Sequence, residues 1–190
     1  MPTKPGERKH QILQTLAAML EDPKAEKITT AALAKRLDVS EAALYRHFAS
    51  KAQMFEGLIE FIEQTLFGLV NKISAEEKSG TKQLEAVLTM LLGFAKKNPG
   101  MTKVLIGDAL VNEDERLQAR INQLHDRLES TLKQALRFAA SEKEIPEGVD
   151  ATAQANLMLA FVVGRWHQFA KSGFRRDPTE HWPAQWPMIL

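Results

Sequence analysis

Apolar residues recur along most of the chain at the three- and four-residue spacing of amphipathic helices. This spacing predicts a short helix over residues 30–37. It predicts further helices over residues 7–21, 51–73, 81–97, 100–110, 114–140 and 150–172. It also predicts a second short helix, after Ser40, that contains Ala43, Leu44 and Phe48, and an irregular or helical tail from Pro178 to Pro187. Because an interior proline costs a helix about 3 kcal/mol, the eight prolines limit where the long helices can lie. The pattern predicts an all-α fold.

Composition agrees with this prediction and narrows the class of protein. Among the 190 residues, Leu and Ala together number 47, against 17 for Val and Ile, a balance that favours helix over sheet. The chain has no cysteine, which excludes disulfide frameworks and thiolate metal sites. No run approaches the ~20 consecutive apolar residues of a membrane helix. We therefore expect a soluble, cytoplasmic protein that has no membrane partner.

Charge is distributed unevenly along a chain whose formal net charge is only +1. Residues 1–55 carry nine Lys or Arg and six acids, so this part has a net charge of +3. The remaining residues have a net charge of −2. Taken alone, an asymmetry of this size is only a weak indication of nucleic-acid binding.

Residues 28–51 have the pattern of two short helices separated by a three-residue break. A Thr before the first helix and a Ser before the second are residues that commonly cap helix N-termini. At the break, the short polar side chain of Asp38 tolerates a left-handed backbone. Ala34, Val39 and Leu44 are expected to fill the angle between the helices. The segment therefore predicts a helix-turn-helix, in which the second helix fits the major groove of DNA.

The polar face of the second helix is the candidate DNA-binding surface. If its apolar residues point inward, Glu41, Ala42, Tyr45 and Arg46 point outward, and Arg46 is suited to a bidentate bond with guanine or to a phosphate. Lys4 and Arg8 could extend this surface as an arm along a groove. The plainer interpretation is a solvated helix surface. The residues predicted to contact DNA are Lys9, Thr29, Thr30, Ser40, Glu41, Ala42, Tyr45, Arg46, His47 and Lys51.

The motif TT-x-x-LA-x-x-L-D-VS-x-x-x-LYRHF-x-SK resembles the DNA-binding segment of TetR-family regulators. One departure occurs inside it, because Asp38 stands where that family usually has Gly. The resemblance implies an N-terminal helix-turn-helix head over residues 1–50, with the motif at about 29–48. It also implies a helical dimerisation and partner-binding domain over residues 51–190.

Later segments, among them LLGFAKKNPGMTKVLIGDAL and DERLQARINQLHDRLE, resemble one branch of that family, the nucleoid occlusion factors. The resemblance implies a homodimer that binds palindromic double-stranded DNA on the nucleoid. It also implies binding of the C-terminal tail of the tubulin-like division protein FtsZ, so that ring assembly is antagonised over unsegregated chromosome. No cofactor, metal or small molecule is implied. The residues expected to bind FtsZ are Phe61, Met90, Gly93, Lys97 and Asn98.

Other interpretations of the body stay open. The segment LTMLLGFAKKNPG also fits a plain buried helix that ends at a Pro-Gly turn. The helices 114–140 and 150–172 are expected to form a four-helix dimer interface, although their apolar stripes could instead complete the core of one chain. The acidic run Glu113-Asp114-Glu115 is expected to begin a helix rather than to hold a metal.

Two other classes of function compete with nucleoid occlusion. Enzyme signatures such as a glycine-rich phosphate loop, a nucleophile elbow or HExxH are absent from the sequence, so an enzyme is not expected. A ligand-responsive TetR-type repressor is the stronger alternative. It requires an enclosed pocket in the body, for which Trp166, His167 and His125 are the candidate lining residues.

Overall fold

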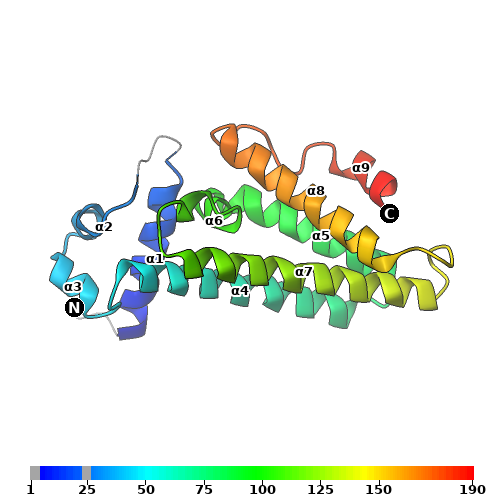
Figure 1. Cartoon of the computed structure of the whole chain (residues 1–190), viewed down its shortest axis with the longest axis horizontal. Helices are drawn as coiled ribbons and strands as arrows, with labels where there is room; N and C mark the ends of the chain where they lie inside the picture. Colours follow the sequence, from blue (N-terminus) through cyan, green and yellow to red (C-terminus); the bar gives the residue numbers. More distant parts are fainter. Residues whose placement is uncertain (1–4, 23–26) are drawn as a thin grey trace. The chain divides into compact units, whose positions relative to one another are not determined.

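The computed structural model describes residues 5–22 and 27–190, and this part of the chain is helical without strands, which confirms the all-α prediction. Lys4 of the predicted arm lies outside the described residues. In chain order (Figure 1) the elements are α1 (Pro5–Leu20), α2 (Thr30–Arg36), α3 (Glu41–Tyr45), α4 (Lys51–Glu76), α5 (Gly80–Lys97), α6 (Pro99–Leu105), the 3₁₀ helix η1 (Asp108–Leu110), α7 (Glu115–Ser141), α8 (Ala151–Lys171) and α9 (Trp182–Ile189).

The chain divides into two compact units. The first, here called the head unit, contains Met1–Ile62 and Pro99–Ile121. The second, here called the body unit, contains Glu63–Asn98 and Asn122–Leu190. The long helices α4 and α7 each contribute residues to both units.

The core of the head unit forms where α1, α2, α3 and the start of α4 bury their apolar residues. Ile12, Leu33, Leu44 and Phe55 are each about 1% exposed. The close approach of α6 to α1 depends on Gly100, because a Cβ at this position would lie 2.0 Å from the carbonyl oxygen of Ala17. The short helices α2 and α3 are stabilised by burial of these apolar side chains rather than by their intrinsic helix propensity.

Tryptophan side chains join the helices of the body unit. Trp166 of α8 is fully buried, and its indole Nε1 donates to the carbonyl oxygen of Leu91 on α5 at 3.0 Å. Trp182 of α9 donates to the hydroxyl of Thr89 at 2.7 Å, and its ring centroid lies 5.7 Å from that of Trp186. These three are all the tryptophans of the chain. The hydrogen bonds of Trp166 and Trp182 join α8 and α9 to α5.

Two predicted elements differ from the structure for local reasons. The second short helix ends at Tyr45, and Phe48 is buried from the turn that follows. The predicted helix 100–110 is divided, because the backbone at Gly107 is left-handed with φ 77° between α6 and η1. The tail predicted as irregular or helical from Pro178 to Pro187 agrees with the structure, in which α9 begins at Trp182.

The apolar stripe of α7 lies in the core of its own chain. Its six large residues, each exposed by 1% or less, are Leu117, Ile121, Leu124, Leu128, Leu132 and Leu136. The apolar surface left exposed on the last two long helices is a different set, in which Leu157 is 50% and Phe138 37% exposed, and Ala160 and Gly164 are also exposed. The interpretation that the α7 stripe completes one chain's core therefore agrees with the structure.

Candidate nucleic-acid interface

Side-chain caps define both helices of the helix-turn-helix, as the sequence predicts. Thr29 Oγ1 accepts from the backbone N–H of Ala32 at 3.1 Å, and Ser40 Oγ accepts from that of Ala43 at 3.3 Å. Asp38 adopts the predicted left-handed backbone, with φ 54°. Because each capping hydroxyl acts here as an acceptor, it keeps its own proton for an external acceptor such as a phosphate oxygen.

A small polar network joins the start of α2 to α3. Thr30 Oγ1 donates to Glu41 Oε2 at 2.7 Å, and the Tyr45 hydroxyl donates to Thr30 Oγ1 at 3.4 Å. In this arrangement the proton of Thr30 is directed to Glu41, while the Tyr45 side chain remains 45% exposed. The network fixes the outer face of α3 relative to α2.

The outer face of α3 is open to solvent. Glu41, Ala42, Tyr45 and Arg46 are all exposed, in agreement with the orientation that the helical spacing predicts. The guanidinium of Arg46 makes no hydrogen bond or ion pair with the described residues, so its donors are available to an external acceptor. Contact of these four residues with DNA stays a prediction.

Beside Arg46 lies a cleft of about 170 Å³ between α1 and α3. Arg46 and the half-buried His47 line it together with Arg8 of α1, over a floor of apolar side chains. Lys9 is exposed one residue further along α1, and its Nζ lies 5.6 Å from the centroid of the Phe48 ring. Four basic or imidazole side chains of the head unit therefore lie on α1 or just after α3. They are Arg8, Lys9, Arg46 and His47.

Lys51 differs from the other predicted DNA-binding residues because its ammonium already has an anionic partner. Its Nζ lies 2.5 Å from Glu113 Oε1 and 5.7 Å from the centroid of the Phe55 ring. The side chains of Lys51 and Glu113 are only 21% and 10% exposed. Glu113 was not among the predicted site residues, and it lies 62 positions away in the sequence.

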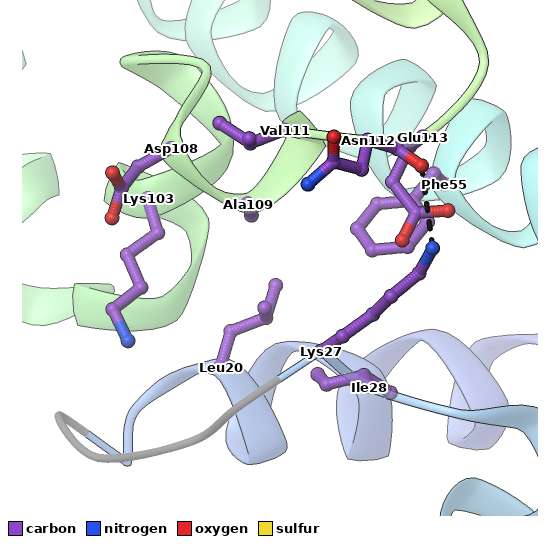
Figure 2. A pocket seen from close by; sticks show the side chains of 10 residues that line it. All are labelled: Leu20, Lys27, Ile28, Phe55, Lys103, Asp108, Ala109, Val111, Asn112 and Glu113. Carbon is purple, nitrogen blue, oxygen red and sulfur yellow. Dashed lines mark hydrogen bonds between the residues drawn. The ribbon is translucent and has the colours of Figure 1, made fainter.

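Glu113 also lines a cavity of about 240 Å³ in the head unit, shown in Figure 2. There Lys27 Nζ donates to the carbonyl oxygen of Asn112 at 3.3 Å, and Phe55 lies at the back of the view. Within the described part of the chain, no group of three or more His, Asp or Glu side chains is arranged to hold a metal ion.

Four of the residues predicted to bind FtsZ lie at the C-terminal half of α5 in the body unit. Met90 and Gly93 are half-buried, and a Cβ at Gly93 would meet no atom within 4 Å. Lys97 is exposed, and Asn98, the C-cap, donates from Nδ2 to the carbonyl oxygen of Phe94 at 2.8 Å. The fifth, Phe61, belongs to the head unit, where its ring meets that of His10 edge-on at 5.6 Å.

The neighbouring cation on α5 is already paired. Lys96 Nζ lies 2.6 Å from Asp177 Oδ2. This contact, with hydrogen bonds from Thr179, lowers the pKa of Asp177 to about 2. Lys97 is therefore the cation at this end of α5 that points to solvent without such a partner among the described residues.

Two family models match this chain, one in its N-terminal part and one in its C-terminal part. Residues 12–58 match the family described as bacterial regulatory proteins, tetR family, and residues 78–190 match the SlmA-like family described as tetracyclin repressor-like, C-terminal domain. The nucleoid occlusion factor SlmA of Alteromonas mediterranea is 53% identical over 183 residues, covering 94% of this chain and 92% of that protein. SlmA of a Marinomonas species is 48% identical over 189 residues, covering 100% and 96%.

The chain belongs to the SlmA branch of the TetR family. Solved structures agree at the level of the fold. A TetR-family regulator from Agrobacterium tumefaciens has a TM-score of 0.80 at 16% identity, covering 98% of this chain and 97% of that one. The regulator FadR from Bacillus halodurans has a TM-score of 0.80 at 14% identity, covering 100% and 96%. No helix in the described ranges is long and apolar enough to cross a bilayer.

Proposed function

We propose that this protein is a nucleoid occlusion factor: a homodimer that binds palindromic DNA and, when bound, antagonises assembly of FtsZ. The observation that carries the proposal is the identity of about 50% to SlmA proteins over nearly the whole chain. That identity extends through the body as well as the head. A shared helix-turn-helix alone would support only DNA binding.

The DNA-binding part of the proposal is supported by the outer face of α3. Arg46 and Tyr45 are exposed there, and α1 adds Lys9 nearby. A single helix-turn-helix reads only a half-site of a few base pairs, so site-specific binding needs a second copy. The exposed apolar residues of α7 and α8, in particular Phe138 and Leu157, are the surface that we assign to this second copy.

The FtsZ-binding part is supported by the chemistry of α5. An acidic and apolar tail peptide requires a cation beside a surface that is not fully polar. Lys97 offers an exposed cation, and Gly93 and Met90 offer open apolar surface on the same side of the helix. We assign the tail to this surface together with Asn98. Phe61 belongs to the head unit, and its contact with FtsZ stays a separate prediction.

The side chains considered for a ligand-responsive repressor do not share one enclosed space. Trp166 is fully buried and bonded to the Leu91 carbonyl, whereas His167, the next residue along α8, is exposed on the surface. His125 is half-buried, with its ring centroid 6.1 Å from that of Trp166. This placement favours nucleoid occlusion over ligand sensing.

The test is sedimentation of FtsZ polymers formed with GTP. The wild-type protein is added with a palindromic duplex selected for its binding, with a scrambled duplex of equal length, or with no DNA. We expect the pelleted FtsZ to fall most with the palindromic duplex. An unchanged pellet under all three conditions would contradict the proposal, and an equal reduction without DNA would contradict activation by DNA.

A further inference from the structure

The pairing of Lys51 with Glu113 is at odds with a simple role for Lys51 as a DNA-contacting cation. Lys51 is the first residue of α4, three positions after the buried Phe48 that follows the second helix of the helix-turn-helix. A cation at this position lies close in the chain to the DNA-binding face. Its Nζ, however, is turned to a carboxylate at 2.5 Å.

The carboxylate comes from the loop between η1 and α7. A second contact, from Lys27, also holds this loop. Asn112 has a left-handed backbone, with φ 64°, and its carbonyl oxygen accepts from Lys27 just before α2 (Figure 2). The next acid along the chain, Asp114, is bonded to Arg116 at 2.8 Å. Glu113 is therefore the acid of this loop that is committed to Lys51.

We propose that Glu113 occupies, within the molecule, the place of a DNA phosphate on Lys51, so that the loop and the DNA backbone compete for one ammonium. This proposal rests on the DNA-binding function proposed above and adds a regulation to the same site. A carboxylate and a phosphate oxygen both accept from an ammonium, and Lys51 cannot direct its charge fully to both. The pair thus limits DNA affinity in the free protein.

The competition has a defined consequence for the variant Glu113→Gln. Loss of the carboxylate charge releases Lys51 for a phosphate, so the affinity for DNA should rise by roughly threefold to tenfold, the scale set by a partly exposed ion pair. If the wild-type complex leaves Lys51 on Glu113, the dependence of log affinity on log salt should also steepen by about one phosphate contact.

The experiment is fluorescence anisotropy of a labelled palindromic duplex at several salt concentrations. Glu115→Gln is the matched control, because it removes the same charge from an exposed position two residues away. The proposal expects tighter binding for Glu113→Gln than for Glu115→Gln. It also expects that this difference disappears when Lys51→Gln is added to both.

Equal affinities of Glu113→Gln and Glu115→Gln would overturn the competition. So would a gain that persists in the Lys51→Gln background, or weaker binding by a Glu113→Gln protein whose circular dichroism and thermal unfolding match the wild type. If Glu113→Gln does not fold, Glu113→Asp replaces it. Asp keeps the charge but is one methylene shorter, so a smaller gain in affinity is expected, and no gain would equally reject the competition.

The result can be separated from the test of the overall function. If the wild type does not prefer the palindromic duplex to a scrambled one, site-specific binding is wrong. The comparison of Glu113→Gln with Glu115→Gln on the scrambled duplex still decides whether Glu113 and the DNA backbone compete, because phosphate contacts do not depend on sequence.

Discussion

Arg46, the C-cap residue of α3, is the side chain of this surface whose removal should weaken DNA binding most. Its guanidinium is exposed and has no partner among the described residues, so it can bond a guanine or a phosphate without first breaking an internal contact. A good bidentate base contact is worth about 1–3 kcal/mol, so Arg46→Ala should weaken binding to the palindromic duplex by about tenfold or more. Anisotropy titration measures this change.

The matched control for that variant is Arg137→Ala on α7. Arg137 is also an exposed arginine, but it lies in the body unit. Its loss removes the same charge, so its effect on affinity measures the nonspecific contribution. Affinities that fall equally for Arg46→Ala and Arg137→Ala would contradict the assignment of the α3 face to DNA.

Asp38 provides a test of backbone strain in the turn between α2 and α3. An L-residue other than glycine adopts its φ of 54° only at a cost, which is modest for Asp and larger for a β-branched residue. Asp38→Gly should raise the free energy of unfolding by about 0.5 kcal/mol, whereas Asp38→Val should lower it by about 1 kcal/mol or more. Urea unfolding measures both, and a stabilising Val would show that the turn is unstrained.

At this scale the sequence predicted well what depends on neighbours along the chain. The capping roles of Thr29 and Ser40 and the left-handed Asp38 are local and follow from residue type. The partner of Lys51 could not be predicted. Glu113 is 62 positions distant, and its own neighbourhood only indicated the beginning of a helix.

Among the helices, α5 begins at a particularly well-bonded N-terminus. The carboxylate of Glu144 accepts from the backbone N–H groups of Gly80 and Thr81, and from the hydroxyls of Ser79 and Thr81 at 2.8 and 2.9 Å. The bond from the Thr81 backbone is the main reason that the pKa of Glu144 is lowered, and the Ser79 hydroxyl adds to it. The packing here is tight, because a Cβ at Gly80 would lie 2.5 Å from the backbone nitrogen of Ala139 on α7.

This carboxylate should make stability depend on pH. Because its pKa is lower in the folded than in the unfolded chain, its contribution is fully present above the usual value of 4.5 and is lost as pH falls through the folded value. Glu144→Gln should lower the melting temperature at pH 7 and should lose less stability on acidification than the wild type. Thermal unfolding followed from pH 7 to pH 3 measures both effects.

Glu147→Gln is the control for the pH experiment, since Glu147 is exposed on the same loop and has no hydrogen bond to the described residues. It should leave the melting temperature at pH 7 nearly unchanged. If both variants behave alike, the bonds at the start of α5 do not contribute the expected stability.

The elements themselves were predictable because apolar spacing reports which face of each helix is buried. Their ends were harder to predict. Phe48 continues the apolar pattern of α3 although the helix ends at Tyr45, because a turn can also bury an aromatic ring. Gly107 divides one apolar pattern into α6 and η1, and the pattern itself carries no sign of the backbone conformation at that glycine.

In the molecule as a whole, the proposed partners use different units. Lys97→Glu reverses the exposed cation of α5 in the body unit, far in sequence from the helix-turn-helix. It should therefore reduce binding of an FtsZ tail peptide by at least about tenfold while DNA affinity changes little, apart from a small general charge effect. Peptide and duplex titrations on the same preparation measure the two affinities.

Lys82→Glu is the matched variant, because Lys82 is an exposed lysine at the other end of α5. Tail binding that survives Lys97→Glu, or that is lost equally in Lys82→Glu, would place the tail elsewhere than on the C-terminal half of α5.

At this scale the sequence could not decide between two uses of one apolar stripe. Leu117 to Leu136 on α7 have the spacing expected either of a dimer interface or of a protomer core. The structure places these residues in the core. The exposed apolar residues are Phe138, which lies outside that spacing on α7, and Leu157, which lies on α8. Helical periodicity identifies a buried face, but it does not say which partner buries it.

The distribution of tryptophan and tyrosine gives each unit its own optical reporter. Trp166, Trp182 and Trp186 all lie in that unit, while the only tyrosine of the chain, Tyr45, lies on the outer face of α3 in the head unit. Excitation at wavelengths that tyrosine does not absorb therefore observes the body alone. Emission from native, unlabelled protein can then follow a peptide arriving at α5, and chemical nitration of Tyr45 can report on an arriving duplex.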